Sequence, residues 1–167
     1  MNLLGVAAAM AVGAIFFSGV PALADTAPSV AQVAPAWKLK DLNGRAVSFD
    51  QFKGKVVVVD FWATWCGPCI GEIPGYIELQ KKYGGEGLVI VGISVDQKGA
   101  APVKKFATSK EINYTIVMAD DHVMDAFGGI ESIPTTFLIN REGKIIHRKV
   151  GAMPHEEYEK LVAAALH

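Results

Sequence analysis

The sequence predicts an α/β domain with a central mixed β-sheet flanked by helices. Two apolar runs rich in β-branched residues, 56–62 and 88–95, are typical of strands that are buried on both faces of a sheet. Segments with the apolar spacing of helices follow them, at 68–83 and 101–110. Two further apolar segments flank a turn at 140–143, which predicts a late β-hairpin. Strands that alternate with helices before a final hairpin favour a layered domain with parallel and antiparallel pairs.

The remaining elements follow from shorter patterns on either side of these strands. An alternating segment and a turn signal predict a β-hairpin at the start of the domain, and a second amphipathic pattern predicts a helix at its end. The expected elements are hairpin strands 37–40 and 46–49, a strand at 114–118, a helix at 121–127, hairpin strands 135–139 and 144–150, and a helix at 155–166.

Residues 1–24 are expected to be a signal peptide or a membrane anchor. No charged side chain occurs between Asn2 and Ala24, and small residues at Ala22 and Ala24 supply a signal-peptidase site before Asp25. An uncleaved anchor stays open, because the apolar stretch is about as long as the shortest spanning helix, roughly 17 residues. Either alternative sends the folded part across a membrane. We therefore expect a periplasmic or otherwise extracytoplasmic protein, either secreted by signal cleavage or anchored by this segment.

The rest of the chain is expected to form a flexible linker, 25–35, and one domain, 36–167. The linker has two prolines and mostly small residues. The 167 residues are 51% hydrophobic and 20% charged, which is enough for one packed core. The net charge of −1 gives no electrostatic reason to expect nucleic acid as a partner. We expect a monomer.

The only two cysteines of the chain carry its chemistry. Cys66 and Cys69 directly follow a predicted buried strand and open a predicted helix, with Gly67 and Pro68 between them. A helix N-terminus has unpaired backbone N–H groups and partial positive charge, so it stabilises a thiolate and lowers its pKa below about 8.5. Pro68 suits a first helical turn, and Gly67 leaves the space near the sulfur open. The sequence therefore predicts a nucleophile, Cys66, and a resolving partner, Cys69, whose redox-active disulfide needs no other cofactor.

Three other uses of the cysteine pair are less consistent with the sequence. A purely structural disulfide would close a four-residue loop and stabilise little. A zinc site needs four ligands, whereas the histidines are scattered and no second cysteine pair exists. A haem attachment site needs histidine after Cys69, where Ile70 stands. We therefore favour the redox pair and expect no metal site.

Two segments resemble the thioredoxin superfamily. Residues 59–69, Val-Asp-Phe-Trp-Ala-Thr-Trp-Cys-Gly-Pro-Cys, resemble its active-site segment, and Ile-Pro-Thr-Thr-Phe at 133–137 resembles its cis-proline segment. The resemblance implies a thioredoxin fold in which Pro134 faces the disulfide and the nearby backbone pairs with a substrate strand. A cis bond before proline costs only about 0.5–1 kcal/mol. The residues expected to bind substrate are Trp65, Gly67, Pro68, Ile133 and Pro134.

Within that superfamily, the chain is most similar to exported proteins of the TlpA/ResA/DsbE type. The marks are the leader, the N-terminal hairpin, an inserted helix and strand at about 97–118, and Glu72 and Pro74 after the cysteines. The resemblance implies that Glu72 tunes the cysteine pair. It also implies reduction of disulfides in exported proteins, often in cytochrome c maturation, with electrons from a membrane donor. The Gly67-Pro68 dipeptide is that of thioredoxins, so a general exported reductase fits equally well.

Asp60 is a further catalytic candidate, because it resembles the buried aspartate of cytoplasmic thioredoxins. The lysine that accompanies that aspartate is replaced here by Gly92. A buried carboxylate without a partner has a raised pKa, and we expect Asp60 to accept the proton of Cys69 through water. Two alternatives stay open: Asp60 faces solvent at its strand end, or Glu72 is an ordinary exposed carboxylate on its helix.

Other functions of the same fold fit the sequence less well. A thiol peroxidase would place threonine three residues before its reactive cysteine, where Ala63 stands. A metal-binding chaperone would have three residues between its cysteines, and here there are two. An oxidase that makes disulfides is disfavoured by the thioredoxin-like Gly67-Pro68 dipeptide. The sequence favours a reductase, with thiol peroxidase or metal-binding chaperone as the alternatives.

Overall fold

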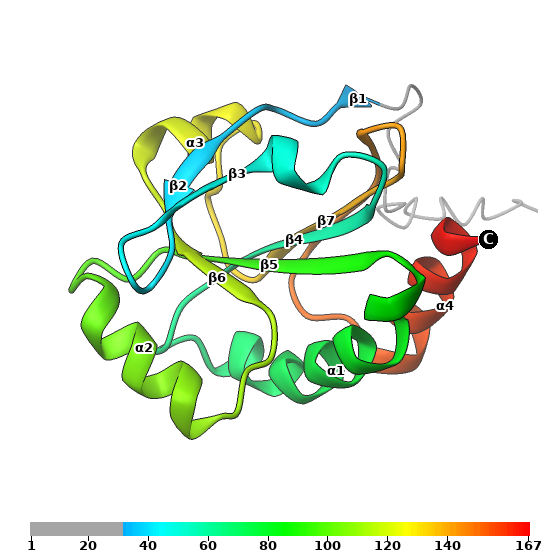
Figure 1. Cartoon of the computed structure of the whole chain (residues 1–167). Helices are drawn as coiled ribbons and strands as arrows, with labels where there is room; N and C mark the ends of the chain where they lie inside the picture. The colour runs from blue at the N-terminus through cyan, green and yellow to red at the C-terminus, as the bar shows by residue number, and fades with distance from the viewer. Residues whose placement is uncertain (1–31) are drawn as a thin grey trace, which may run out of the picture.

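A six-stranded mixed sheet forms the middle layer of the molecule (Figure 1). The computed structural model describes residues 32–167, so the expected leader at 1–24 and residues 25–31 of the expected linker lie outside the described residues. The strand order is β1-β8-β7-β4-β5-β6. The pairs β4–β5 and β5–β6 are parallel, and the others are antiparallel. The strands are β1 (Gln32–Val33), β4 (Val56–Trp62), β5 (Leu88–Ser94), β6 (Thr115–Met118), β7 (Thr135–Ile139) and β8 (Lys144–Val150).

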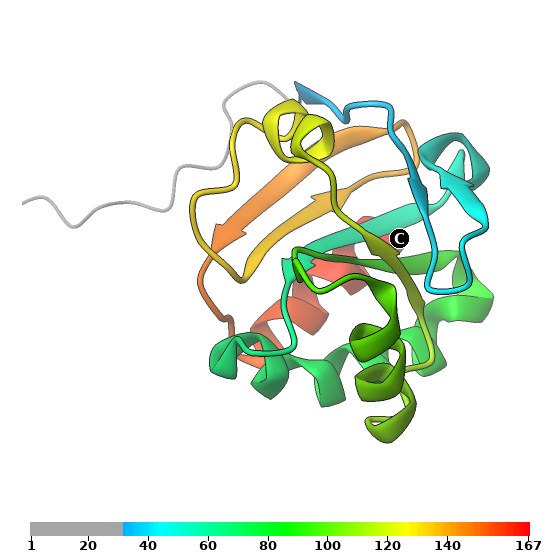
Figure 2. The same cartoon turned by 90° about the vertical axis from the view of Figure 1, so that its left-hand side faces the viewer.

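Helices cover both faces of this sheet (Figures 1 and 2). One face carries α1 (Gly67–Tyr83), α2 (Ala100–Ser109) and α4 (His155–Leu166). The other carries α3 (Asp121–Ala126) and the hairpin of β2 (Lys38–Lys40) and β3 (Ala46–Ser48). Short 3-10 helices, η1 (Phe49–Phe52) and η2 (Gly84–Glu86), complete the elements. The thioredoxin fold, with its N-terminal hairpin and its inserted α2 and β6, is therefore confirmed.

The position of β4 explains how the sheet sets up the site. All seven residues of β4 are buried, which fits a strand that has neighbours on both sides and helices above and below. Side chains alternate along a strand, so Val57, Val59 and Phe61 pack towards α3. Val58 and Trp62 pack towards α1. Asp60 stands between these two residues on the α1 face.

The start of the folded domain lies earlier than the expected boundary at residue 36. Gln32 and Val33 form β1 and pair with β8, and the backbone N–H of Ala34 donates to the carbonyl oxygen of Gly143 at 2.8 Å. Ala34 is buried. The expected linker therefore does not extend to residue 35. A two-residue strand is too short to show a periodic pattern, and its pairing partner lies more than a hundred residues away in the sequence.

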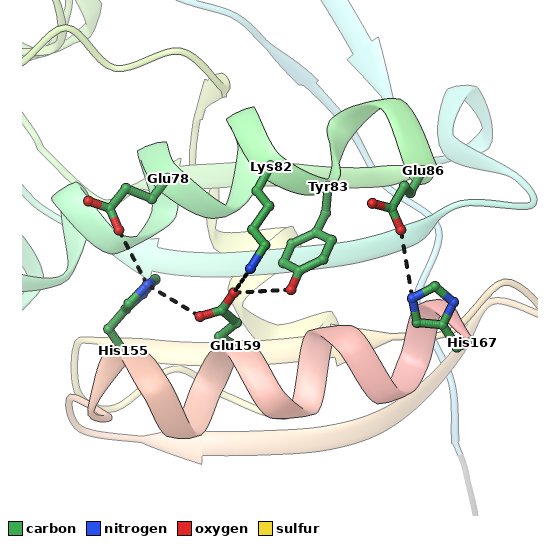
Figure 3. A network of polar contacts seen from close by, with 7 residues as sticks. All are labelled: Glu78, Lys82, Tyr83, Glu86, His155, Glu159 and His167. Carbon is green, nitrogen blue, oxygen red and sulfur yellow. Dashed lines mark hydrogen bonds and ion pairs between the residues drawn. The ribbon is translucent and has the colours of Figure 1, made fainter.

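Helices α1 and α4 are joined by a polar network on their outer surfaces (Figure 3). Glu159 of α4 accepts hydrogen bonds from Lys82 Nζ at 2.7 Å and from the hydroxyl of Tyr83 at 3.0 Å. Nε2 of His155 lies 3.4 Å from Oε2 of Glu78 and 3.9 Å from Oε2 of Glu159. These contacts fix the last helix of the chain against the helix that carries the cysteines. Within residues 32–167, no helix has the length and apolar character needed to cross a membrane.

Candidate active site

The two cysteines lie where β4 ends and α1 begins. Cys66 is the N-cap residue of α1 and Cys69 is in its first turn, and a disulfide joins them with their Cα atoms 5.3 Å apart. The backbone N–H of Cys69 points at Sγ of Cys66, with 3.3 Å between nitrogen and sulfur. In the reduced protein, this N–H group and the positive end of α1 favour the thiolate of Cys66. Cys66 is also the more exposed of the two, at 6% against 1% for Cys69.

The loop before Cys66 is anchored by Asp96, which the sequence analysis missed. Asp96 accepts hydrogen bonds from the backbone N–H of Thr64 at 3.0 Å and from the Thr64 hydroxyl. It also accepts one from the hydroxyl of Ser94 at 2.9 Å. The carboxyl ends of parallel strands share one edge of a sheet, so polar residues after β4 and β5 are brought together there. This rule could have identified Asp96 from the sequence as a residue that positions the loop carrying Cys66.

The cis-proline segment lies beside the disulfide. The Ile133–Pro134 peptide bond is cis, as the resemblance predicted. The carbonyl oxygen of Ile133 is 3.8 Å from Sγ of Cys66. Trp65 is 69% exposed, and the space where a Cβ of Gly67 would stand is open. Trp65 and Gly67 thus flank Cys66 in the chain and the Ile133 carbonyl lies beside its sulfur. A role in substrate binding for these residues, and for Pro68 and Pro134, stays a prediction.

Asp60 is buried and has no cationic partner among the groups that shift its pKa. Its Oδ1 accepts a hydrogen bond from the hydroxyl of Thr136 at 3.1 Å. Gly92 stands opposite Asp60 on β5, and a Cβ there would lie 2.9 Å from Nε1 of Trp62, so the indole fills this space. Burial raises the pKa of Asp60 to about 8, with a smaller contribution from the charge of Glu72. The alternative that Asp60 faces solvent is wrong.

Glu72 is half-buried, one helical turn after Cys69. Its Oε1 accepts a hydrogen bond from the backbone N–H of Met153 at 3.0 Å, while its Oε2 is buried with no hydrogen-bond partner in the described structure. Burial raises the pKa of Glu72, and the Met153 N–H opposes this shift. Glu72 is therefore not an ordinary exposed carboxylate. Its charge also contributes to the raised pKa of Asp60.

Throughout the part of the chain that the structure describes, no three His, Cys, Asp or Glu side chains are grouped so as to hold a metal ion. Cys66 and Cys69 are bonded to each other. The arrangement of the described residues fits thiol–disulfide exchange, in which a thiolate attacks a disulfide through a mixed-disulfide intermediate.

Most of the chain matches a known protein family. The Redoxin family matches residues 24–166. The chain belongs to the Redoxin family. Within this family it is a thioredoxin-like thiol–disulfide oxidoreductase similar to proteins of the ResA and DsbE type. The match includes the Cys66–Cys69 segment and the cis-proline segment.

Individual relatives of this Redoxin-family chain support the assignment. The thiol-disulfide oxidoreductase ResA of Bacillus subtilis is 38% identical over 121 residues, which are 72% of this chain and 66% of that protein. ResA of Geobacillus thermodenitrificans is 36% identical over 81% of this chain and 77% of its own length. A thiol:disulfide interchange protein of the thioredoxin family from Chlorobium tepidum has a solved structure with a TM-score of 0.77 and 33% identity. The match covers 84% of this chain and 100% of the solved chain.

The raised pKa of Asp60 predicts a pH-dependent effect of Asp60→Asn on stability. The folded state holds this proton up to about pH 8, whereas an unfolded aspartate releases it near its ordinary pKa of 3.8. Between these values folding takes up a proton. The contribution of Asp60 to the free energy of unfolding is therefore fully present below about pH 4 and is lost as the pH rises towards 8. Each unit of pKa difference corresponds to about 1.4 kcal/mol. Asp60→Asn should therefore be a few kcal/mol more stable than wild type at pH 8, on the order expected from this linkage.

Urea unfolding of the oxidised proteins from about pH 2 to about pH 9 measures this difference. Asp41→Asn is the matched control, because hydrogen bonds from Arg45 and Asn43 lower the pKa of Asp41. That variant should lose stability relative to wild type above the ordinary aspartate pKa, and the deficit should disappear in acid. Parallel stability curves for wild type and Asp60→Asn would contradict the raised pKa.

Proposed function

We propose that this protein reduces disulfide bonds of exported proteins outside the cytoplasm. The observation that carries the proposal is the position of Sγ of Cys66 at the N-terminus of α1, 3.3 Å from the backbone nitrogen of Cys69. This environment stabilises a thiolate and so prepares Cys66 for attack. The Gly67-Pro68 dipeptide, which resembles that of thioredoxins, favours the reducing direction.

The exchange proceeds in two steps. The Cys66 thiolate attacks one sulfur of the substrate disulfide, forms a mixed disulfide and releases the other substrate sulfur as a thiolate. Cys69 then loses its proton to Asp60, attacks Sγ of Cys66 and releases the second substrate thiolate. The substrate gains two electrons and the protein is left with the Cys66–Cys69 disulfide. A dithiol donor must reduce this disulfide before the next cycle.

Substrate recognition is assigned to the surface around the sulfur. Trp65 offers an exposed aromatic face beside Cys66, and Ile133 offers a carbonyl group 3.8 Å from the sulfur. An extended substrate segment that pairs with the backbone at Ile133 would place its disulfide over Cys66. Pairing of this kind depends little on substrate side chains, which fits a reductase that acts on several proteins.

The location and the electron donor are part of the same proposal. The apolar segment at 3–20 and the Ala22-Leu23-Ala24 sequence support export, by cleavage or with retention of an anchor. In that compartment the protein needs electrons from a membrane donor, and proteins of cytochrome c maturation are one class of substrate that the resemblance implies. We propose that it acts as a monomer and without nucleic acid.

Replacement of the nucleophile should abolish turnover. Cys66→Ser is expected to reduce insulin no faster than dithiothreitol alone, because serine is not ionised near neutral pH and forms no disulfide. A turbidity assay of insulin reduction measures this. Thr108→Ser, an exposed change on α2, is the control and should keep the wild-type rate. Full activity of Cys66→Ser would overturn the role of Cys66.

Replacement of the resolving cysteine should trap the substrate. Cys69→Ser is expected to form the mixed disulfide at Cys66 and to release it only slowly, because no second thiol is close enough to attack it. Mass spectrometry of complexes captured in the cell envelope identifies the natural substrates. The double variant Cys66→Ser/Cys69→Ser is the control and should capture none. A failure of Cys69→Ser to accumulate any mixed disulfide would contradict the resolving role of Cys69.

A further inference from the structure

Two buried hydroxyl groups lie in line with Asp60 on the α1 side of the sheet. Thr136 stands opposite Asp60 in the β4–β7 pair, and its hydroxyl donates to Asp60 Oδ1 at 3.1 Å. The hydroxyl of Tyr76, from α1, is 3.3 Å from Oγ1 of Thr136. When Asp60 is ionised it only accepts hydrogen bonds, so Thr136 donates to Asp60 and Tyr76 donates to Thr136. The result is a continuous line of hydrogen bonds from α1 to the buried carboxylate.

A small cavity between α1 and α4 has Tyr76, the last residue of this line, in its lining. It has a volume of about 70 Å³, and Tyr76 lines it together with Glu72, His155 and Tyr158. A buried water needs roughly 10–15 Å³ and two to four polar partners, so the cavity has room for water. Glu72 and Tyr158 each carry a buried oxygen atom that has no hydrogen-bond partner in the described structure. The lining also includes apolar groups, but the partnerless oxygens of Glu72 and Tyr158 give a water molecule in this cavity hydrogen-bond partners.

Asp60 stands between the disulfide and this hydroxyl cluster. On the same face of β4, Trp62 packs in the cluster that contains Cys66 and Cys69. Val58, on the other side of Asp60, packs with Tyr76 and Tyr158. A proton that reaches Asp60 from the cysteine side therefore has the hydroxyl groups next to it on the opposite side.

We propose that Thr136 and Tyr76 form a proton relay that connects Asp60 to the cavity between α1 and α4. The proposal rests on the proposed function, in which Asp60 accepts the proton of Cys69. Once Asp60 is protonated, both hydroxyl groups turn so that Asp60 donates to Thr136, Thr136 donates to Tyr76 and Tyr76 donates to a water in the cavity. Each donor then passes its proton along this line. One proton leaves for each Cys69 thiolate formed, Asp60 is ionised again, and both hydroxyl groups end neutral and donate towards Asp60 as before.

The surroundings of Asp60 favour this exit over direct contact with solvent. Asp60 is only 4% exposed, and the indole of Trp62 fills the space above Gly92. Burial raises the pKa of Tyr76 and that of Tyr158, so both phenols stay neutral and can donate and accept at once. The relay therefore passes protons without ionising either phenol.

The rim of the cavity leads to exposed groups of the α1–α4 network. Gly75 lines the cavity, and a Cβ there would lie 2.6 Å from Nδ1 of His155, so glycine allows the start of α4 to approach α1 closely. His155 also contacts the exposed Glu78 of α1 (Figure 3). A proton released into the cavity thus meets groups that exchange protons with solvent.

Removal of either hydroxyl should slow only the resolving step. Stopped-flow measurements with reduced protein and a peptide disulfide carrying a fluorogenic group on each sulfur follow the first and second thiol release separately. Thr136→Val and Tyr76→Phe are expected to slow the second release by about tenfold, with an altered solvent deuterium isotope effect, and to leave the first unchanged. Thr136→Ser restores the hydroxyl and should restore the rate that Thr136→Val loses.

Tyr114→Phe is the matched control for Tyr76→Phe. The Tyr114 ring contacts the Tyr76 ring edge-on, with centroids 6.3 Å apart. Burial raises the pKa of Tyr114, and the charge of Asp60 raises it further. Tyr114 is not part of the hydrogen-bonded line from Asp60, so its replacement should leave both releases at the wild-type rate. An equal loss in Tyr114→Phe and Tyr76→Phe would show a packing effect and overturn the relay.

Two further outcomes separate the relay from the proposed function. If Asp60→Asn slows the second release while Thr136→Val and Tyr76→Phe match wild type in rate and isotope effect, the relay is wrong and the reductase assignment stands. If Asp60→Asn also matches wild type, Asp60 does not accept the proton of Cys69. The relay is then wrong as well, and the reductase assignment still stands. A wild-type protein that never attacks the peptide overturns the proposed function and the relay with it.

Discussion

The contact between the backbone N–H of Cys69 and Sγ of Cys66 is the interaction on which the active site depends. It exists because α1 begins one residue after Cys66, so the sulfur caps the helix and faces its unpaired N–H groups. The fully buried strand β4 fixes where that helix starts. Asp96 fixes the loop between them from the end of β5. The carbonyl oxygen of Ile133, just before β7, lies 3.8 Å from the same sulfur.

The second constraint is a buried carboxyl group without a cation. Gly92 offers no side chain, and Trp62 occupies the space above it, so Asp60 is surrounded by apolar groups, hydroxyls and a second acid. Such a carboxyl destabilises the fold at the pH where it ionises, and this cost is consistent with a role in proton transfer. The hydroxyl of Thr136 donates a hydrogen bond to this carboxyl group, and the hydroxyl of Tyr76 lies within hydrogen-bond distance of Thr136. Thiolate stabilisation at Cys66 and the proton acceptance that we propose for Asp60 thus depend on different parts of one helix and one strand.

Much of this arrangement could be predicted from local sequence. The β-branched run at β4 gave the strand with its observed bounds, because a strand buried on both faces needs apolar residues throughout. The cysteine pair could be found from residue type and spacing, and the cis-proline segment from its resemblance to the thioredoxin superfamily. Asp60 could be named from the sequence, but its burial, and so its raised pKa, needed the structure.

The parts that could not be predicted depend on contacts between distant segments. The strand β1 has two residues and is defined only by its pairing with β8. The bond from Thr136 to Asp60 depends on the register between β4 and β7, and the approach of Tyr76 depends on how α1 packs on the sheet. Local patterns of hydrophobicity carry no information on such registers.

The most direct test of the account is the titration of the Cys66 thiol in the reduced protein. Thiolate absorbance measured against pH gives this value, and the Cys69→Ser variant assigns the low transition to Cys66. The account predicts a pKa clearly below the value of about 8.5 for a free cysteine. A pKa at or above that value would show that the helix terminus does not activate the sulfur, and the account would be wrong.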